Sequence, residues 1–358
     1  MIKVIFEGSI FLHQKKGGIS KYIQKINDRF TKYNIKSEIY APIIISDILI
    51  SNKKNVTYFF KIDKIPRFFT KFFYTLNGLL TIFYINKLKP NILHFTYYNN
   101  FLISYIKTPY ILTVYDLIHE RLRDKNKKFN KSKLISKAKH IICISKQTKK
   151  DLVKFYKIND EKISIIYPGI DSEIRYKKKT KEKYILFVGS RGRYKNFNNF
   201  IKAYARSKFL MKNFKIVCFG VEQFNYDEIR LFNKSKIVDQ IIFKTGDDLK
   251  LENYYRKASL FVTTSLLEGF GLTPLEAMRC GCPVIASDIP IFRETLGNSC
   301  VYANTKNVSD ITKMIESTLK SKNTQKRLIK RGYKRIKKFS WDKCTLETAK
   351  LYRQLAST

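Results

Sequence analysis

Short apolar runs recur along the whole chain, and each is followed by turn residues and then by a stretch with helical spacing. In the first half they are IKVIFEG, SEIYAPIII, NILHFT, YILTVYD, HIICIS and ISIIYPG; in the second they are KYILFVGS, FKIVCFG, QIIFKTG, SLFVTTS, PVIASD and CVYA. Near-continuous apolar strands alternating with amphipathic helices indicate parallel sheets covered on both faces. The pattern therefore predicts an α/β fold of doubly wound parallel sheets.

A polar, charged segment without strand pattern, residues 171–183, separates the two sets of predicted strands. A chain of 358 residues also exceeds the usual size of one hydrophobic core. We therefore predict two Rossmann-like domains, residues 1–172 and 173–340, and expect residues 341–358 to form a helix that packs back toward the N-terminal domain. Because ligands of doubly wound sheets bind at the carboxyl ends of the strands, we expect both domains to face a central cleft.

One segment of the second half, SLLEGFGLTPLEAMRCGCPVIASD, places Glu268 and Glu276 eight positions apart around a glycine-rich turn. The preceding SLFVTTS is typical of a strand, and PLEAMRC is typical of a helix that starts at Pro274 with Thr273 as its N-cap. The sequence Thr-Pro-Leu-Glu also matches a capping box, in which Glu276 would have a purely structural role.

The same turn suits a phosphorylated ligand, because glycines let the backbone come close and a helix N-terminus offers free amides. The residues expected to contact such a ligand are Gly269, Phe270, Gly271, Leu272 and Thr273. Acids beside a phosphate site would accept hydrogen bonds from hydroxyl groups, Glu268 from a sugar and Glu276 from a ribose. A sugar nucleotide carries both kinds of hydroxyl on either side of a diphosphate, so this segment predicts a sugar-nucleotide site.

These motifs resemble those of the family 4 retaining glycosyltransferases, which have the two-domain GT-B fold. The two spaced glutamates in EGFGLTPLEAM resemble the family signature. GGISKY, with Gly17 and Gly18, resembles the N-terminal glycine loop that faces the donor diphosphate and the acceptor. VGSRGRYKNF resembles the basic donor-phosphate motif, with Arg191 and Lys195 at the matching positions. HFTYY, TVYDLIHE and FSWDK also resemble the branch of bacterial O-antigen mannosyltransferases.

The basic motif is consistent with that resemblance. Arg191 and Lys195 follow a predicted strand on a turn that contains Gly189 and Gly192. Two cations there would neutralise a diphosphate leaving group, whose charge grows in the transition state. Arg193 offers a substitute for either cation.

The sequence departs from the family where many members carry a histidine before an aspartate of the first domain. Here that site reads Tyr115-Asp116, and the nearest histidine is His119. Tyrosine, with an ordinary pKa near 10, donates a hydrogen bond but is a poor base at neutral pH. The resemblance implies that the leaving phosphate takes the acceptor proton, which leaves Tyr115 a positioning role. Asp116 would either orient a sugar hydroxyl or cap the following turn.

The formal net charge of +41 is spread evenly over both halves, which is untypical of a nucleic-acid-binding stripe. The basic clusters at residues 121–140 and 320–338 are interpreted as solvated faces. Residues 66–87 interleave Phe, Tyr and Lys but are too short in uncharged length to span a bilayer. This segment is either an interfacial helix against anionic lipid or a core helix of the first domain.

We find no D-x-D motif, no clustered metal ligands and no signal peptide. We predict no metal, no cofactor and a cytoplasmic enzyme with peripheral attachment to the inner membrane face. The resemblance implies a retaining hexosyltransferase that moves mannose from GDP-mannose to a lipid-linked or lipopolysaccharide O-antigen glycan, with guanine read by residues 244–249. It also implies that residues 1–172 bind the acceptor and residues 173–340 bind the nucleotide sugar. The alternatives are a UDP-sugar donor, an epimerase or phosphorylase on the same scaffold, and a basic nucleic-acid-binding protein.

Overall fold

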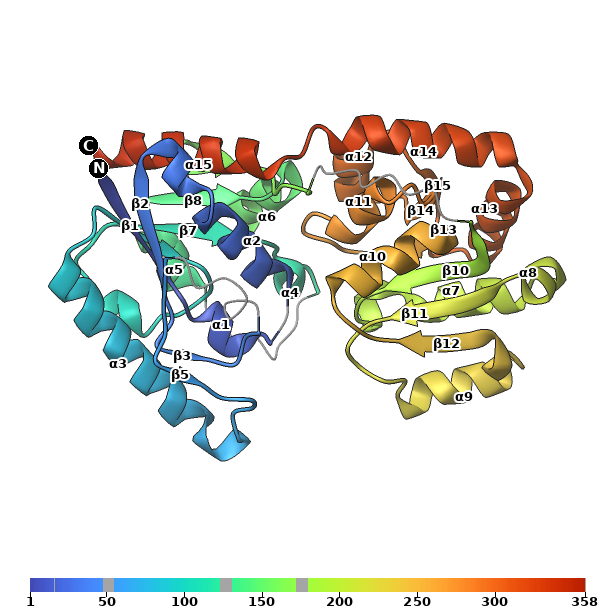
Figure 1. The fold of residues 1–358 in the computed structure, drawn as a ribbon, viewed down its shortest axis with the longest axis horizontal. Coiled ribbons are helices and arrows are strands. Elements are labelled where there is room, and N and C mark those ends of the chain that lie inside the picture. Colours follow the sequence, from blue (N-terminus) through green and yellow to red (C-terminus); the bar gives the residue numbers. More distant parts are fainter. Residues whose placement is uncertain (16, 48–54, 123–130, 172–179, 358) are drawn as a thin grey trace. The chain divides into compact units, whose positions relative to one another are not determined.

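The computed structural model describes residues 1–15, 17–47, 55–122, 131–171 and 180–357 (Figure 1). The chain divides into two compact units. Unit 1 comprises Met1–Gly169 together with Phe339–Thr358, and unit 2 comprises Ile170–Lys338. Each unit is built around a parallel sheet, as the apolar runs predict, and each is described here by itself.

The main sheet of unit 1 has the strand order β4-β2-β1-β6-β7-β8-β9 within the described residues, and every neighbouring pair is parallel. Its strands are β1 (Ile2–Glu7), β2 (Ile35–Tyr40), β4 (Val56–Thr57), β6 (Ile92–Phe95), β7 (Tyr110–Val114), β8 (His140–Cys143) and β9 (Ile163–Ile165). Every residue of β6, β7 and β8 is buried. This explains their unbroken apolar sequences, because helices cover both faces of the sheet. A short parallel pair, β3 (Ile43–Ile44) and β5 (Phe60–Lys61), lies outside this sheet.

The helices of unit 1 are α1 (Ile10–His13), α2 (Gly18–Asn27), α3 (Thr70–Leu88), α4 (Ile118–Arg121), α5 (Ser132–Lys137), α6 (Lys146–Tyr156) and α15 (Trp341–Ala356). Four 3-10 helices join them: η1 (Phe30–Tyr33), η2 (Arg67–Phe69), η3 (Leu102–Ser104) and η4 (Asp160–Lys162).

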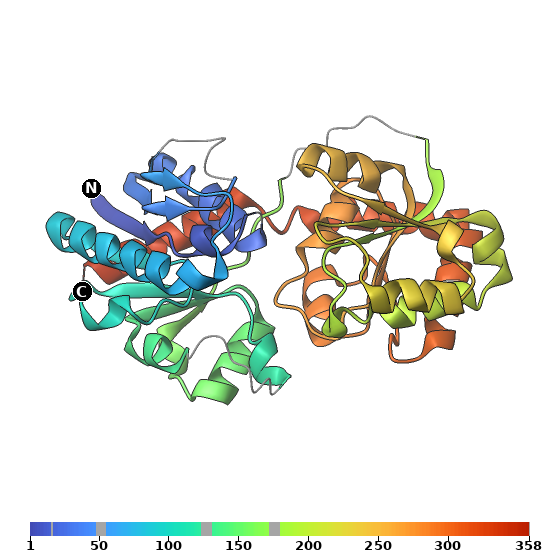
Figure 2. The same cartoon turned by 90° about the horizontal axis from the view of Figure 1, so that it is seen from below.

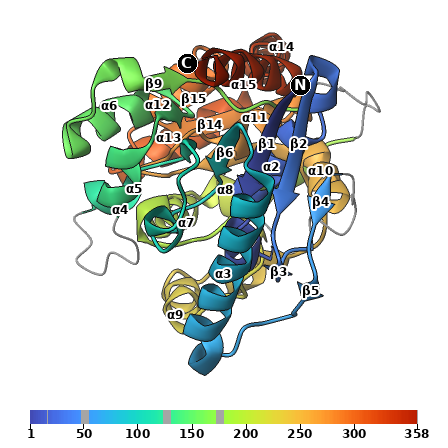
Figure 3. The same cartoon turned by 90° about the vertical axis from the view of Figure 1, so that its left-hand side faces the viewer.

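The last helix, α15, belongs to unit 1, where it packs against α2, η1 and β1 (Figures 2 and 3). Tyr352 on this helix stacks on Phe30, and its hydroxyl lies 2.5 Å from Nδ1 of His94. Burial lowers the pKa of His94 to about 3, so its imidazole stays neutral at working pH. The contact is structural, and it ties the end of the chain to the centre of the first sheet.

Unit 2 contains a parallel sheet with the strand order β12-β11-β10-β13-β14-β15. Its strands are β10 (Glu182–Val188), β11 (Lys215–Phe219), β12 (Ile241–Lys244), β13 (Ala258–Thr263), β14 (Val284–Ser287) and β15 (Val301–Ala303). Its helices are α7 (Phe197–Ala205), α8 (Lys208–Asn213), α9 (Tyr226–Lys234), α10 (Asp248–Lys257), α11 (Leu272–Arg279), α12 (Pro290–Leu296), α13 (Val308–Lys320) and α14 (Lys322–Ile336), with 3-10 helices η5 (Arg193–Lys195) and η6 (Val238–Gln240).

Helix α3, which covers the aromatic segment, contributes Ile85 to the core of unit 1, with Ile82, Tyr84 and Leu88 packed against that core. Most of its side chains are exposed or half-buried, and exposed phenylalanines continue onto η2 and β5. The exposed large apolar residues of this region are Phe59, Phe60, Phe68, Phe69, Phe72, Leu79 and Phe83. We call this set the aromatic ledge. In the described part of the chain, no helix combines the length and apolar character needed to cross a membrane.

Candidate active site

The glycine-rich turn leads from β13 into α11, but the helix begins earlier than the sequence predicts. Leu272 is its first residue, and Gly271 is the N-cap with φ 85° and no side-chain hydrogen bond. A Cβ on Gly271 would lie 2.6 Å from the Phe292 ring, so both backbone and packing demand glycine here. The predicted start at Pro274 with a Thr273 cap is therefore wrong. The capping-box role of Glu276 falls with it, because the N-cap carries no side chain.

Lys195 and Glu268, from two separate motifs, form an ion pair at the carboxyl ends of neighbouring strands β10 and β13. Nζ of Lys195 lies 2.6 Å from Oε1 of Glu268, and the two side chains are 20% and 15% exposed. The pair remains accessible, so a polyphosphate can compete with the carboxylate for the ammonium group.

The two turns that carry this pair are also joined through their backbones. Leu266 N donates to Tyr194 O at 2.7 Å, and the Thr264 hydroxyl donates to Lys195 O and Asn196 O. These bonds fix the lysine turn against the glutamate turn independently of the ion pair. Such a fixed frame is what a preorganised site requires.

Arg191 is held in a different environment from Lys195. Its guanidinium donates to both carboxylate oxygens of Glu228 at 2.6 and 3.2 Å, and to the carbonyls of Glu222 and Gln223. The side chain is only 5% exposed and lies over the ring of Phe224. In this arrangement the guanidinium is paired with Glu228, and its role facing a donor diphosphate stays a prediction. Through this pair Arg191 ties the turn after β10 to the first turn of α9.

The glycines of the basic motif leave space in front of the turn after β10. Gly189 has φ 108°, and nothing lies within 4 Å of a Cβ built on it. Gly192 also faces open space, and its φ lies outside the left-handed region. Neither strain nor packing within unit 2 therefore accounts for Gly192, whereas close approach of a ligand to the backbone would.

Glu276 lies on α11 and accepts a hydrogen bond at 3.3 Å from the hydroxyl of Tyr255, a buried residue of α10. Burial, with Glu276 adding to it, raises the pKa of Tyr255 well above its ordinary value, so the hydroxyl remains a donor. The sequence analysis did not identify Tyr255 as a site residue. Its position on the apolar face of α10 indicates burial but not a contact with Glu276. Glu252 was missed as well; it pairs with Arg279 of α11 at 2.8 Å and so fixes α10 against α11. In the loop predicted to read guanine, Asp247 caps α10 through the Lys250 amide.

In unit 1 the predicted glycine loop begins helix α2. Gly17 is the N-cap with extended backbone, φ −174°, and Gly18 is the first helical residue; no side chain caps this end. A Cβ on Gly17 would meet only the flexible end of Gln14. The first turn of α2 thus presents backbone amides without an acidic side chain.

Tyr115 and Asp116 follow strand β7. Tyr115 is buried edge-on against Tyr22, at 5.6 Å between ring centroids, and its hydroxyl has no hydrogen-bond partner among the described residues. Burial raises its pKa well above 10, so it is not a base. Oδ1 of Asp116 accepts from the amide of Ile118 at 3.2 Å, which is the turn cap that the sequence allowed.

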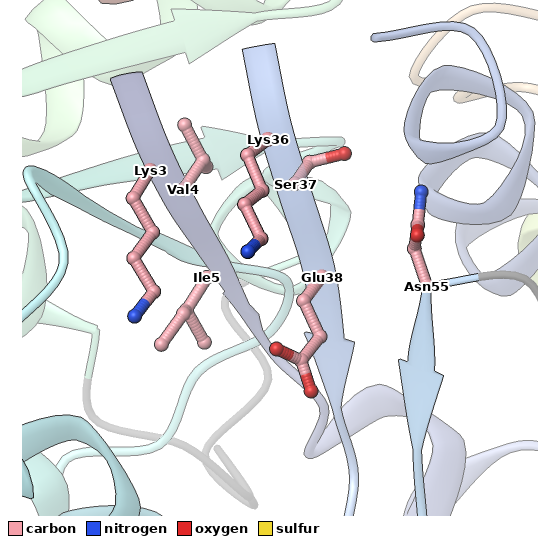
Figure 4. A pocket seen from close by; sticks show the side chains of 7 residues that line it. All are labelled: Lys3, Val4, Ile5, Lys36, Ser37, Glu38 and Asn55. Carbon is pink, nitrogen blue, oxygen red and sulfur yellow. The ribbon is translucent and has the colours of Figure 1, made fainter. Parts of the chain in front are cut away.

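Two further features bear on where a ligand could bind: groups of metal-ligating side chains and a small hollow in unit 1. Within the described residues no group of three or more His, Cys, Asp and Glu side chains is arranged to hold a metal ion. A hollow of about 80 Å³ lies along β1 and β2 beside Lys3, Lys36 and Glu38 (Figure 4). It lies away from the carboxyl ends of these strands, where ligands of doubly wound sheets bind.

Two family models match the chain. Residues 171–335 match the model described as glycosyl transferases group 1, and residues 16–174 match the model described as Glycosyltransferase Family 4. The chain therefore belongs to the glycosyltransferases that these two models describe.

Among curated relatives, the chain is 35% identical over 178 residues to the O-antigen chain mannosyltransferase RfbU of Salmonella typhimurium, an alignment that covers 48% of each chain. It is 33% identical over 166 residues to an N-acetylgalactosaminyltransferase of Campylobacter jejuni, whose name specifies a diphospho-undecaprenol-linked substrate; 45% of this chain and 44% of that one are covered. The chain thus spans about half the length of the curated relatives it matches.

The solved structure of sucrose-phosphate synthase from Thermosynechococcus elongatus is similar over 100% of both chains, with a TM-score of 0.81 and 17% identity. At that identity the likeness concerns the fold alone. It confirms the predicted GT-B fold class.

Proposed function

We propose that this protein is a retaining hexosyltransferase that moves mannose from GDP-mannose to a lipid-linked or lipopolysaccharide O-antigen glycan. The observation that carries the proposal is the Lys195–Glu268 pair, fixed at the strand ends beside the uncapped N-terminus of α11. The likeness to an O-antigen mannosyltransferase supports the choice of mannose.

In this proposal the donor diphosphate rests on the amides of Leu272 and Thr273, and Lys195 leaves Glu268 to contact it. A helix N-terminus and a lysine together favour a dianionic group. Glu268, released from the lysine, then accepts a hydrogen bond from a hydroxyl of the transferred sugar. Glu276, oriented by the buried Tyr255 hydroxyl, accepts one from the ribose. The growing charge of the leaving diphosphate is met by groups of the protein, without a resident metal or cofactor.

Retention of configuration requires the acceptor oxygen to bond to the anomeric carbon on the same face from which the diphosphate leaves. On that face the departing phosphate oxygen, freed as its bond to the anomeric carbon breaks, takes the acceptor proton. The residue at the family's histidine position supports this route, because Tyr115 is buried and its raised pKa keeps it neutral. Within unit 1, Tyr115 packs on Tyr22 of the helix that the glycine loop begins, and Asp116 fixes the turn that follows β7; we assign both residues positioning roles.

The acceptor side of the proposal includes peripheral contact with anionic lipid on the inner face of the membrane. Phe68, Phe69 and Phe72 of the aromatic ledge are exposed, Phe68 at 90%, and Lys64 and Lys71 are exposed between and beside them. Exposed aromatic rings with interleaved lysines are typical of segments that lie in a membrane interface.

Co-sedimentation with vesicles tests this contact. We expect binding to phosphatidylglycerol vesicles, weaker binding to phosphatidylcholine vesicles, and loss of binding in a Phe68→Ser, Phe72→Ser variant. Phe155→Ser is the matched control, since Phe155 is exposed on another helix of unit 1. Equal binding by both variants would remove the ledge from the proposal.

Thermal unfolding with nucleotides tests the donor assignment. A ligand at 100 times its dissociation constant stabilises the folded state by about 2.7 kcal/mol. We expect GDP to raise the melting temperature more than UDP, ADP or CDP. A response to UDP alone would replace mannose by a UDP-sugar, and no response to any nucleoside diphosphate would reject the transferase proposal.

A further inference from the structure

Unit 1 contains a second, larger hollow at the carboxyl ends of β1 and β6. Its volume is about 470 Å³, within the usual range for small-molecule sites. Its walls come from the segment after β1, from the start of α3 and from the segment after β6. In a doubly wound sheet this end of the strands is where ligands bind, and Tyr97 and Tyr98 of the HFTYY motif lie in its wall.

Aromatic rings from three elements form one wall of this hollow. His13 of α1 lies 4.6 Å from the ring of Tyr74 on α3 and 4.9 Å from the ring of Tyr97 after β6. Nδ1 of His13 lies 2.6 Å from the Tyr74 hydroxyl, which fixes both side chains. Burial raises the pKa of Tyr74 to about 12, so the phenol is protonated and neutral at working pH.

A buried carboxyl group organises the polar side of the hollow. Glu7 at the end of β1 accepts hydrogen bonds from the amide and the hydroxyl of Ser9, at 3.0 and 2.8 Å, and from the side chain of Asn99. Glu7 is fully buried, whereas Ser9 and Asn99 line the hollow. The carboxyl group therefore positions neutral hydroxyl and amide groups from two strand ends and is itself buried behind them.

The lining chemistry selects the kind of ligand. No Asp, Glu, Lys or Arg lines the hollow among the described residues, so there is no cation to hold a phosphate. Tyr98, also in the lining, carries a buried hydroxyl with no hydrogen-bond partner among the described residues. Flat aromatic faces beside hydroxyl and amide groups match a ring with apolar C–H faces and hydroxyl edges.

We propose that this hollow binds a neutral saccharide ring of the acceptor, with His13, Tyr74 and Tyr97 against its face and Ser9 and Asn99 at its hydroxyls. That the sugar belongs to the acceptor rests on the proposed transferase function, whereas the binding of a neutral sugar is independent of that function. Tyr74 lies two positions from Phe72 of the aromatic ledge, and α3 runs along the outer side of unit 1 (Figure 3). A sugar held here has an apolar surface beside it for a lipid carrier.

Saturation-transfer NMR on the full chain tests the proposal with defined probes: the methyl glycosides of mannose, glucose, galactose and N-acetylglucosamine, and mannose 6-phosphate. We expect at least one methyl glycoside to bind and its affinity to fall about tenfold or more in Tyr74→Ala and in Tyr97→Ala. Tyr105→Ala is the matched control, an exposed tyrosine of unit 1 outside the hollow, and should leave binding unchanged. Mannose 6-phosphate should bind more weakly than the neutral mannoside.

Three results would overturn the proposal: no methyl glycoside binds, binding is the same in Tyr74→Ala as in the unchanged chain, or the phosphorylated sugar binds best through Tyr74. Tyr74→Phe guards against misfolding, because it keeps the ring and loses only the bond to His13. It should bind with intermediate affinity.

Nucleotide titrations of the same variants separate this proposal from the proposed function. If GDP and UDP do not bind but the glycoside binds through Tyr74, the transferase proposal fails and the sugar site stands. If a nucleotide binds equally in all variants while no glycoside responds to Tyr74→Ala, the sugar site alone fails.

Discussion

The main sheets of unit 1 and unit 2 are both parallel, but the side chains at the carboxyl ends of their strands differ in charge. In unit 2 the strand ends carry an ion pair, Lys195 with Glu268, beside a helix N-terminus. In unit 1 the strand ends carry a neutral wall around His13, Tyr74 and Tyr97. Unit 2 thus provides a charged site of the kind that suits a diphosphate, and unit 1 provides a hollow whose described lining has no Asp, Glu, Lys or Arg, which is the kind that suits a sugar. The side chains at the strand ends, and not the sheets themselves, therefore determine which kind of ligand each unit suits.

A second contrast lies within unit 2, between the two cations of the basic motif. Arg191 and Lys195 are four positions apart on the same turn. Arg191 is 5% exposed and bound to Glu228, whereas Lys195 is 20% exposed. Both cations are paired with a glutamate, but the lysine is the more exposed of the two, so we expect it to reach a ligand more readily than the arginine.

The largest expected effect concerns the stability of Arg191→Ala. Breaking a buried ion pair leaves Glu228 without its partner, and the expected cost is about 3–5 kcal/mol of unfolding free energy. Denaturant titration measures it. Arg293→Ala is the matched control, because its pair with Asp288 is exposed and should contribute about 1 kcal/mol or less. Unchanged stability together with loss of GDP binding would show that both cations of the motif serve the ligand.

The next effect concerns turnover in Lys195→Ala. Removing the accessible cation from a charged transition state is expected to slow transfer by about 100- to 1,000-fold, with the fold retained. The rate of transfer or of donor hydrolysis is measured as the rate at which the nucleoside diphosphate is released. Lys202→Ala on the exposed side of α7 is the control. A loss below tenfold would mean that the leaving group is stabilised elsewhere.

The smallest effect concerns pH and the buried carboxyl of unit 1. Burial raises the pKa of Glu7 from 4.5 to about 7. Between these values the folded state binds more protons than the unfolded state, so the contribution of Glu7 to stability is full below pH 4.5 and is lost as pH rises through 7. The loss is at most about 3 kcal/mol. Unfolding free energies of Glu7→Gln should therefore decline less over this interval than those of the unchanged chain; equal slopes would contradict a shifted Glu7.

Much of this organisation is readable from the sequence. Each apolar run of the pattern contains a strand, because buried parallel strands need apolar residues on both faces. Strands β4 and β5 lie outside these runs, because each is only two residues long and is too short to leave a periodic pattern in the sequence. The motif around Glu268 and Lys195 was also readable, since glycines, acids and cations occur at fixed spacing.

What the sequence could not predict depends on contacts between distant residues. Nothing near Arg191 indicates that Glu228, 37 positions away, would neutralise it. The predicted start of α11 was wrong because Thr-Pro matches the usual N-cap pattern. In the structure Gly271, with a positive φ, occupies the N-cap position two residues earlier. The neutral hollow of unit 1 joins residues 9 to 99, and although Tyr97 and Tyr98 belong to the HFTYY motif, nothing local in the sequence places them beside His13 and Tyr74.

A crystal structure with GDP bound tests the central claim most directly. We predict that the diphosphate contacts the amides of Leu272 and Thr273, and that Nζ of Lys195 moves from Glu268 to a phosphate oxygen. A diphosphate bound elsewhere, with the Lys195–Glu268 pair intact at 2.6 Å, would contradict the account.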